Sequence, residues 1–261
     1  MVELFFREYG VKNQPVILIL HGLLGISDNW IPFAKQFVEN GFYVVIPDLR
    51  NHGRSPHNDV FNFEVMAADV WNLIENQKLE LPILLGHSMG GKLAALMALE
   101  KPEKISKLIL ADTALSPFKK LYQHLDLIRI MQQLDLSKYN SISEIEKTLS
   151  EQLDTKKMRN FLLKNLYRTK EKTFAWRSNL EQLKENILRL NAPKEPTNGY
   201  EKPTLCLRSE TSGFVEQSDF DFLKQFFPNV TLKTIENASH WLHVDQPEAF
   251  MTSCLEFLRL S

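Results

Sequence analysis

Cysteine is scarce in this chain. Only Cys206 and Cys254 occur among the 261 residues, and the two do not form a Cys-x-x-Cys pair. Both lie in apolar stretches, which suit a buried thiol better than a zinc ligand or a disulfide framework. This pattern favours a reducing compartment, and we expect the protein to be cytoplasmic.

An excess of charge of one sign is also missing. Lysines and arginines number 31 against 32 aspartates and glutamates, so the formal net charge is −1. Without a basic surface the chain has no electrostatic basis for binding nucleic acid. No run of about 18 apolar residues occurs, and the N-terminal MVELFFREYG lacks the pattern of a signal peptide. We therefore expect neither nucleic-acid binding nor membrane insertion.

What the chain does have is an alternation of short, β-rich apolar runs with helical segments. Such alternation is typical of an α/β fold with a parallel sheet and crossover helices. The predicted strands are Leu4–Arg7, Val16–Leu20, Tyr43–Pro47, Ile83–Leu85, Leu108–Ala111, Thr204–Leu207 and Thr231–Ile235. The predicted helices are Asp28–Glu39 with Asp28 as its cap, Phe63–Asn76, Lys92–Glu100, Phe220–Phe226 and Glu248–Leu260.

One long stretch departs from this alternation. Ser116–Leu190 has no convincing strand and carries amphipathic helical patterns such as LYQHLDLIRIMQQL and SEIEKTLSEQL. We interpret residues 116–200 as a helical lid, closed by NAPKEPTNGYEKP and inserted into a core of residues 1–115 and 201–261. Its mixed charges lack the strongly basic face of a membrane-surface helix, so the lid is expected to pack over the sheet edge.

The heptapeptide GHSMGGK, Gly86 to Lys92, fits two different motifs. It nearly completes a phosphate-binding loop, but Leu93 stands where that loop needs a hydroxyl to bind Mg²⁺. It fully matches the G-x-S-x-G of a nucleophile elbow, with an apolar run before Ser88 and helix-forming residues after it. We favour the elbow over a glycine-rich turn with an incidental serine. Its glycines should leave room for close packing, and Lys92 is expected to carry its charge in solvent.

A serine nucleophile needs a histidine base and donors for an oxyanion. Of the seven histidines, only His240, in NASHW, comes just after the last predicted strand, where a hydrolase of this type places its base. His243 is the reserve candidate. For the oxyanion hole we predict the backbone N–H groups of Met89, after the nucleophile, and of Leu23, in HGLLG after an early strand.

The acid that orients the histidine is harder to assign. In hydrolases with a nucleophile elbow, the acid usually follows the strand after the lid. In this chain Ser212, which has no carboxylate, stands at about that position. The acidic residues nearby are Glu210, Glu216, Asp219 and Asp221. Asp112 ends the strand after the nucleophile's helix, and a carboxylate there can also reach the back of the histidine. A buried aspartate without a partner would be costly, so we favour Asp112.

Taken in order, these segments resemble the α/β-hydrolase superfamily and, more narrowly, the YbfF-type bacterial esterases and their ABHD11-like relatives. The matching stretches are HGLLGISDNW, PDLRNHGRSPH, GHSMGGK, LADTALSP, FAWRSNL and ASHWLHVDQPEAF. The resemblance implies a triad of Ser88, Asp112 and His240, no cofactor and no metal. It also places Trp176 and Arg177 near the mouth of a pocket, although packing inside the lid is the alternative for Trp176.

The same resemblance bears on two further stretches. Ser209 and Glu210 depart from the glycines common in these relatives, which leaves Glu210 as a possible contributor to the site. The loop from Asp48 to His52 more often braces the elbow than contacts substrate.

The predicted function is a serine hydrolase acting on short- to medium-chain acyl esters or thioesters, with a small molecule as its partner. Three alternatives share the same sequence features. The triad would also serve an acyltransferase or thioesterase, or a lyase like that of the menaquinone pathway. A non-catalytic ligand-binding protein that has kept the fold is the third, although such proteins usually lose a member of the triad.

Overall fold

The computed structural model describes residues 1–117, 121–191 and 198–259 of the chain. Residues 118–120 and 192–197, which belong to the predicted lid, and Leu260, which ends the last predicted helix, lie outside the described residues. No helix in the described part is both long and apolar enough to cross a membrane.

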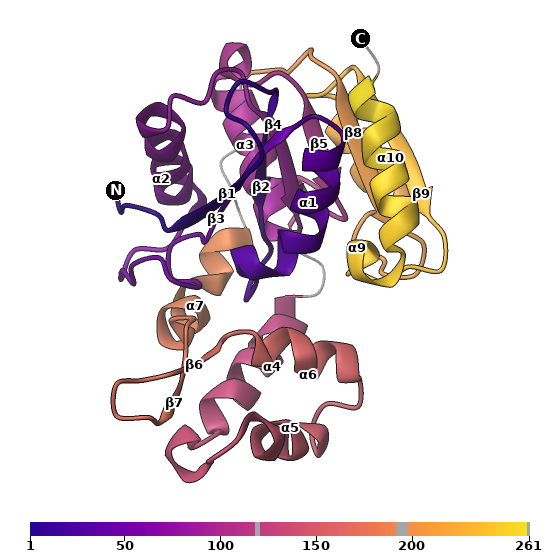
Figure 1. The fold of residues 1–261 in the computed structure, drawn as a ribbon. Helices are drawn as coiled ribbons and strands as arrows, with labels where there is room; N and C mark the ends of the chain where they lie inside the picture. The colour runs from indigo at the N-terminus through magenta and orange to yellow at the C-terminus, as the bar shows by residue number, and fades with distance from the viewer. Residues whose placement is uncertain (118–120, 192–197, 260–261) are drawn as a thin grey trace.

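A seven-stranded sheet forms the centre of the molecule (Figure 1). Its strand order is β1-β3-β2-β4-β5-β8-β9, and every neighbouring pair is parallel except β1 with β3. The strands are β1 Phe6–Tyr9, β2 Val16–Leu20, β3 Tyr43–Pro47, β4 Ile83–His87, β5 Leu108–Ala111, β8 Thr204–Ser209 and β9 Val230–Ile235. The prediction of a mostly parallel α/β sheet is confirmed.

Helices cover both faces of this sheet. Alternate side chains of the buried runs point to opposite faces, because the side-chain period of a strand is two. Ile17 and Ile19 pack with α1 and α10, whereas Leu18 and Leu20 pack with α2 and α3 (Figure 1). The core helices are α1 Ile31–Glu39, α2 Phe63–Asn76, α3 Met89–Glu100, α8 Gln217–Lys224, α9 Leu242–Asp245 and α10 Pro247–Arg259, with 3-10 turns η1 Ser27–Trp30 and η2 Pro102–Lys104.

Two details of the first predicted helix were wrong. The segment begins as the 3-10 turn η1 and becomes α-helical only at Ile31. Asp28 does not cap it, because its carboxylate forms ion pairs with Arg7 at 2.6 Å and Arg54 at 3.1 Å. The charge of those two arginines outweighs the preference of aspartate for an N-cap.

The inserted segment lies beyond the carboxyl edge of the sheet (Figure 1). It contains α4 Leu121–Gln133, η3 Leu136–Lys138, α5 Ile142–Ser150, α6 Lys156–Leu163, β6 Leu166–Arg168, β7 Phe174–Trp176, α7 Leu180–Asn186 and η4 Ile187–Asn191. The expectation of no strand was wrong, because β6 and β7 form an antiparallel hairpin. Strands of three residues are too short to show a period-two pattern in the sequence. The segment has a small core of its own around Ile145, Leu149 and Phe174.

Candidate active site

Ser88 occupies a sharp turn between strand β4 and helix α3. Its backbone angles, φ 54° and ψ −119°, lie in a region that residues other than glycine rarely adopt. Strand β4 is fully buried before the turn, and the helix begins at Met89 directly after it. This strand, strained turn and helix are the context that a nucleophile elbow requires.

The glycines around Ser88 allow three pieces of backbone to approach closely. A Cβ atom on Gly86 would collide with the carbonyl of Gly90, and one on Gly90 would collide with the backbone of Leu20 in the neighbouring strand. A Cβ on Gly91 would strike the side chain of Thr113. The predicted steric purpose of these glycines is therefore confirmed, because any larger residue would push the turn off the sheet.

His240 and Asp112 complete a chain of hydrogen bonds that starts at Ser88. A carboxylate can only accept, so the Nδ1–H of His240 donates to Asp112 Oδ2 at 2.8 Å. His240 Nε2 is then left to accept from the Ser88 hydroxyl at 2.9 Å. Phe214 stacks on the His240 ring with centroids 3.8 Å apart, which restricts the orientation of the ring. All three members of the chain are buried.

Asp112 is held in its ionised form by its neighbours. Burial raises the pKa of this carboxyl, but the hydrogen bond and charge of His240 and donors on Ser209 and Ser212 outweigh it, so the pKa is lowered. The backbone N–H and the hydroxyl of Ser209 both donate to Asp112 Oδ1, at 2.9 and 2.8 Å. Ser209, which stands where the similar proteins commonly have glycine, thus supplies two hydrogen-bond donors to Asp112.

The other acidic candidates have different partners. Glu210 is exposed and accepts from the backbone N–H of Asn237 at 2.8 Å. Asp219 accepts from Ser116 Oγ at 2.6 Å, and Asp221 accepts from Gln217 Nε2. Glu216 is the N-cap residue of α8. Of the acids considered from the sequence, Asp112 is the one whose carboxylate the structure brings to His240.

The two candidate oxyanion donors flank the nucleophile. Met89 is the first residue of α3, and the first N–H groups of a helix have no partner within it. On the other side, a Cβ atom at Gly22 would lie 3.3 Å from the Cβ of Ser88, so the HGLLG loop runs directly beside the elbow. Leu23, the next residue, lines the same cavity as Ser88.

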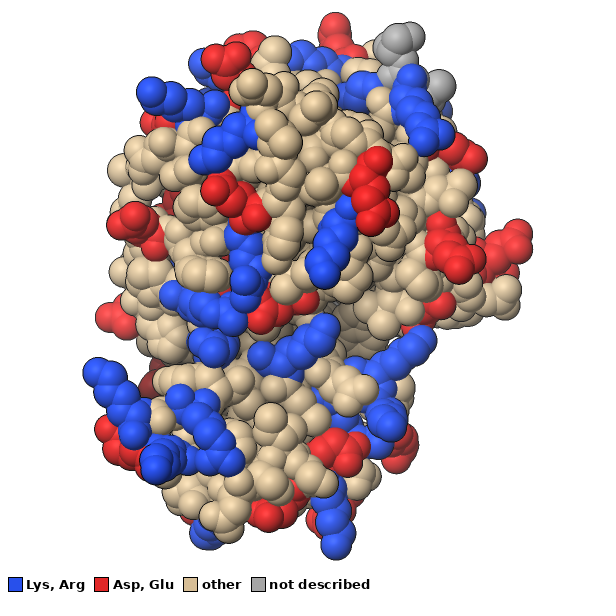
Figure 2. Space-filling view, in the orientation of Figure 1, with Lys and Arg blue, Asp and Glu red and all other residues tan. Residues whose placement is uncertain are grey.

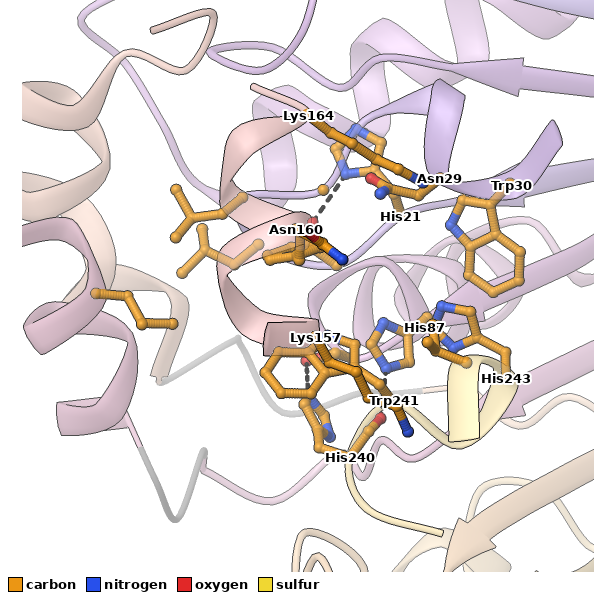
Figure 3. Close-up of a pocket in the computed structure, with 18 of the residues that line it drawn as sticks. His21, Asn29, Trp30, His87, Lys157, Asn160, Lys164, His240, Trp241 and His243 are labelled. Carbon is orange, nitrogen blue, oxygen red and sulfur yellow. Dashed lines mark hydrogen bonds between the residues drawn. The ribbon is translucent and has the colours of Figure 1, made fainter. Parts of the chain in front are cut away.

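A cavity of about 180 Å³ opens over Ser88 between the core and the insertion (Figure 3). Core residues such as Leu23, Trp30 and Trp241 form one side of it, and Leu127 and Phe161 come from helices of the insertion. The residues that line this cavity in the described part of the chain do not include Trp176 or Arg177.

The side chains of Trp176 and Arg177 instead make contacts within the insertion. Trp176 Nε1 donates to the carbonyl of Met131 at 3.0 Å, and the Arg177 guanidinium lies over the Tyr167 ring. The packing alternative considered for Trp176 agrees with this placement.

Two of the other histidines, His87 and His243, are buried near His240. His87 Nε2 donates to the carbonyl of His240 at 2.8 Å, and burial lowers the pKa of His87 to about 3, so this ring is neutral. His243, the reserve base, stacks on Trp30 with centroids 4.4 Å apart, and burial lowers its pKa well below the usual value. The serine hydroxyl is bonded to His240, while His243 lies behind it against Trp30.

The loop after β3 contacts the HGLLG segment, which runs beside the elbow, rather than the elbow itself. The backbone N–H of Leu49 donates to His21 Nε2 at 2.9 Å, and His21 Nδ1 donates to the carbonyl of Gly22. Burial lowers the pKa of His21 to about 4, which keeps it neutral and able to accept from Leu49. Asp48 accepts from the backbone N–H of Ser27, the start of η1.

The expectation that Lys92 is exposed was wrong. Its side chain is completely buried, and its Nζ donates to the carbonyl of Ser116 at 2.6 Å. Burial lowers the pKa of Lys92 to about 7, against the opposing charge of Asp219. Helix α3 is buried on nearly every side, so even a lysine on it is enclosed. Lys92 therefore ties α3 to the residue at which the insertion begins.

Sequence reasoning missed several residues that shape the site. Phe214 and Asn165 come from distant segments, and no local pattern marks either. Asp245 accepts from the backbone N–H and the hydroxyl of Ser239, directly before His240, and its place in HVDQP could have drawn attention to it. Among the described residues, no group of three or more His, Cys, Asp or Glu side chains is arranged to hold a metal ion.

Comparison with known proteins gives a consistent result. A family model described as alpha/beta hydrolase fold matches residues 15–247. The sn-1-specific diacylglycerol lipase ABHD11 of Mus musculus is 33% identical over 256 residues, covering 95% of this chain and 82% of that protein. Esterase YbfF of Escherichia coli strain K12 is 26% identical, with 95% and 94% covered. A solved structure described as a marine microorganism esterase has a TM-score of 0.94 and 37% identity, covering 98% of this chain and all of that one.

Proposed function

The chain belongs to the alpha/beta-hydrolase fold family and is an ester hydrolase, and we propose that it acts as a serine carboxylic-ester hydrolase through an acyl-enzyme on Ser88. The observation that carries this proposal is the continuous hydrogen-bond chain from Ser88 Oγ through His240 to Asp112. A hydroxyl that donates to an oriented imidazole nitrogen is an activated nucleophile.

In the first half of the proposed reaction, Ser88 Oγ attacks the ester carbonyl while His240 Nε2 takes its proton. Asp112 stabilises the imidazolium that forms, and the amides of Met89 and Leu23 donate to the oxyanion. Collapse of the tetrahedral intermediate breaks the bond to the leaving alcohol or thiol, which receives the proton from His240. The acyl group is then bound to Ser88 as an ester.

In the second half, water takes the place of the alcohol. His240 accepts a proton from water as its oxygen attacks the acyl carbonyl, and then returns that proton to Ser88 Oγ as the carboxylic acid leaves. No redox or metal-dependent step enters this sequence. The site residues needed for it all come from loops at the carboxyl edge of the sheet.

The substrate class of the proposal follows from the cavity. A volume of about 180 Å³ with a mostly apolar surface suits a short acyl group better than a long one. Leu127 and Phe161 from the insertion contribute to this lining, so the insertion limits the length of the acyl chain. Short-chain esters, or thioesters of the same acyl groups, are the substrates we propose.

The experiment compares wild type and Ser88→Ala on p-nitrophenyl butyrate. We expect kcat to fall by at least about 10³-fold with an unchanged melting temperature, because the nucleophile is lost while the fold is kept. An alkyl fluorophosphonate probe should label wild type and not the variant. Ser137→Ala, an exposed serine of the insertion, is the matched control and should behave as wild type. Full activity in Ser88→Ala would contradict the proposal.

A further inference from the structure

One face of helix α6 borders the cavity above Ser88. The lining residues Lys157, Asn160, Phe161 and Lys164 are spaced three, four and seven positions apart, which places them on one side of a helix. Phe161 supplies an apolar surface, whereas the other three carry hydrogen-bond donors. Figure 3 shows both lysines reaching from α6 toward the core side of the cavity, where Asn29 and Trp241 lie. The insertion thus provides both shape and charge to the site.

The charge on this face is not balanced. No aspartate or glutamate is among the described residues that line the cavity. Lys157 forms an ion pair with Asp245, which neutralises it. Lys164, the C-cap residue of α6, has no acidic partner among the described residues, and its side chain lies at the rim of the cavity. In a chain of net charge −1, the rim of the site therefore carries an uncompensated positive charge.

Lys164 and the buried His243 line the same cavity. The pKa of His243 is lowered chiefly by burial, then by His87 and His240, and also by the charge of Lys164. Figure 2 shows lysine and arginine side chains gathered along the waist where the insertion meets the core. A positive field at the mouth of an apolar cavity attracts anions and raises their local concentration.

Resting on the proposed function, we propose that Lys164 and Asn160 form a subsite for an anionic group of the substrate, so that the enzyme prefers esters carrying a negative charge near α6. The ammonium group supplies charge, and the Asn160 amide one turn earlier supplies an N–H donor. The apolar part of the same substrate lies against Phe161 and reaches Ser88. The charge is located on either the acyl or the alcohol portion, and the two are separable by experiment.

The test uses two pairs of substrates that differ by one carboxylate. p-Nitrophenyl butyrate and mono-p-nitrophenyl succinate carry the difference on the acyl side, and phenyl acetate and 4-acetoxybenzoate carry it on the alcohol side. The measured quantity is the ratio of kcat/KM for the anionic ester to that for its neutral partner. We expect Lys164→Met to lower this ratio about fivefold in at least one pair, which is the size of a partly exposed ion pair.

Lys170→Met is the matched control. Lys170 is an exposed lysine of the insertion in the turn between β6 and β7, away from the lining residues, and its removal should leave both ratios unchanged. Lys164→Glu should lower the ratio further, and about 0.5 M NaCl should lower it in wild type more than in Lys164→Met. Lys157 is not the test residue, because its loss would also release Asp245 beside the His240 loop.

The outcomes separate this proposal from the proposed function. Hydrolysis of the neutral esters with ratios that Lys164→Met leaves unchanged in both pairs would overturn the anionic subsite alone. An equal fall in Lys170→Met would also overturn it, because the effect would then be one of net charge. A wild-type enzyme that neither cleaves the neutral esters nor reacts with a fluorophosphonate would instead overturn the proposed function.

Discussion

The loops around Ser88 and the helical insertion of residues 121–191 are held in place in different ways. Around Ser88, the same geometry is fixed by strained backbone, by glycines at positions where a Cβ atom would collide, and by buried hydrogen bonds. The insertion has a small core of its own, shares the main hydrophobic core through residues such as Leu127, Leu162 and Leu183, and is joined to the rest of the molecule by further hydrogen bonds. Two of these are Asn165 Nδ2 to the Leu24 carbonyl and Asn179 N–H to the Asn51 carbonyl.

This difference indicates that the core positions the triad, whereas the insertion determines which substrates fit. A triad tolerates displacements of only fractions of an ångström, so it belongs on elements that packing cannot easily shift. Substrate preference, by contrast, depends on which side chains of the insertion face the cavity, and these can differ while the buried contacts that hold Ser88 stay the same. Substitutions in the two regions should therefore differ in both size and kind of effect.

The largest effect should come from the acid in the core. Asp112→Asn keeps the shape of the side chain but removes the charge that orients and stabilises His240, and we expect kcat to fall about 10⁴-fold. The matched control is Glu210→Gln, which changes the exposed carboxyl that the sequence left as an alternative. We expect its kcat to stay within about twofold of wild type. Steady-state kinetics on p-nitrophenyl butyrate checks both. A larger loss in Glu210→Gln than in Asp112→Asn would reverse the assignment of the acid.

A smaller effect should come from a contact that joins the two regions. Asn165 is buried, and its Nδ2 donates to the carbonyl of Leu24, next to the predicted oxyanion donor Leu23. In Asn165→Ala that carbonyl loses its partner, and we expect kcat to fall about tenfold with a smaller change in KM, because the oxyanion loop is less well positioned. The exposed Asn140→Ala is the control on the same insertion. A lower melting temperature with unchanged kcat would mean that Asn165 only stabilises the fold.

The sequence is most informative about the buried parts of the fold. Runs such as Val16–Leu20 and Tyr43–Pro47 are apolar throughout because both faces of a parallel sheet are covered, and their boundaries matched the structure. The position of Asp112 at a strand end also placed it at the edge where Ser88 lies. These inferences succeed because they depend on local pattern and on the common direction of parallel strands.

Other features depend on contacts that no local pattern contains. The spacing of Lys157, Asn160 and Lys164 was readable, but only the docked insertion shows which face of α6 borders the cavity. Lys92 is a different case, because the apolar residues surround α3 on all sides and indicate a buried helix. A lysine in such a helix should have been expected inside, with a specific acceptor.

The smallest predicted effect concerns this lysine, which connects the rigid core to the start of the insertion. Because the pKa of Lys92 is lowered from 10.5 to about 7 in the folded protein, the cost of burying its charge is fully present below pH 7 and is relieved as the pH rises. Wild type should therefore gain about 0.7 kcal/mol of stability relative to Lys92→Met between pH 6.5 and 7.5. Chemical denaturation of both proteins at these two pH values measures the difference. If the difference in unfolding free energy between the two proteins did not change with pH, the Ser116 carbonyl and Asp219 would be keeping Lys92 charged throughout. The core would then contact the start of the insertion through an ammonium ion rather than a neutral amine.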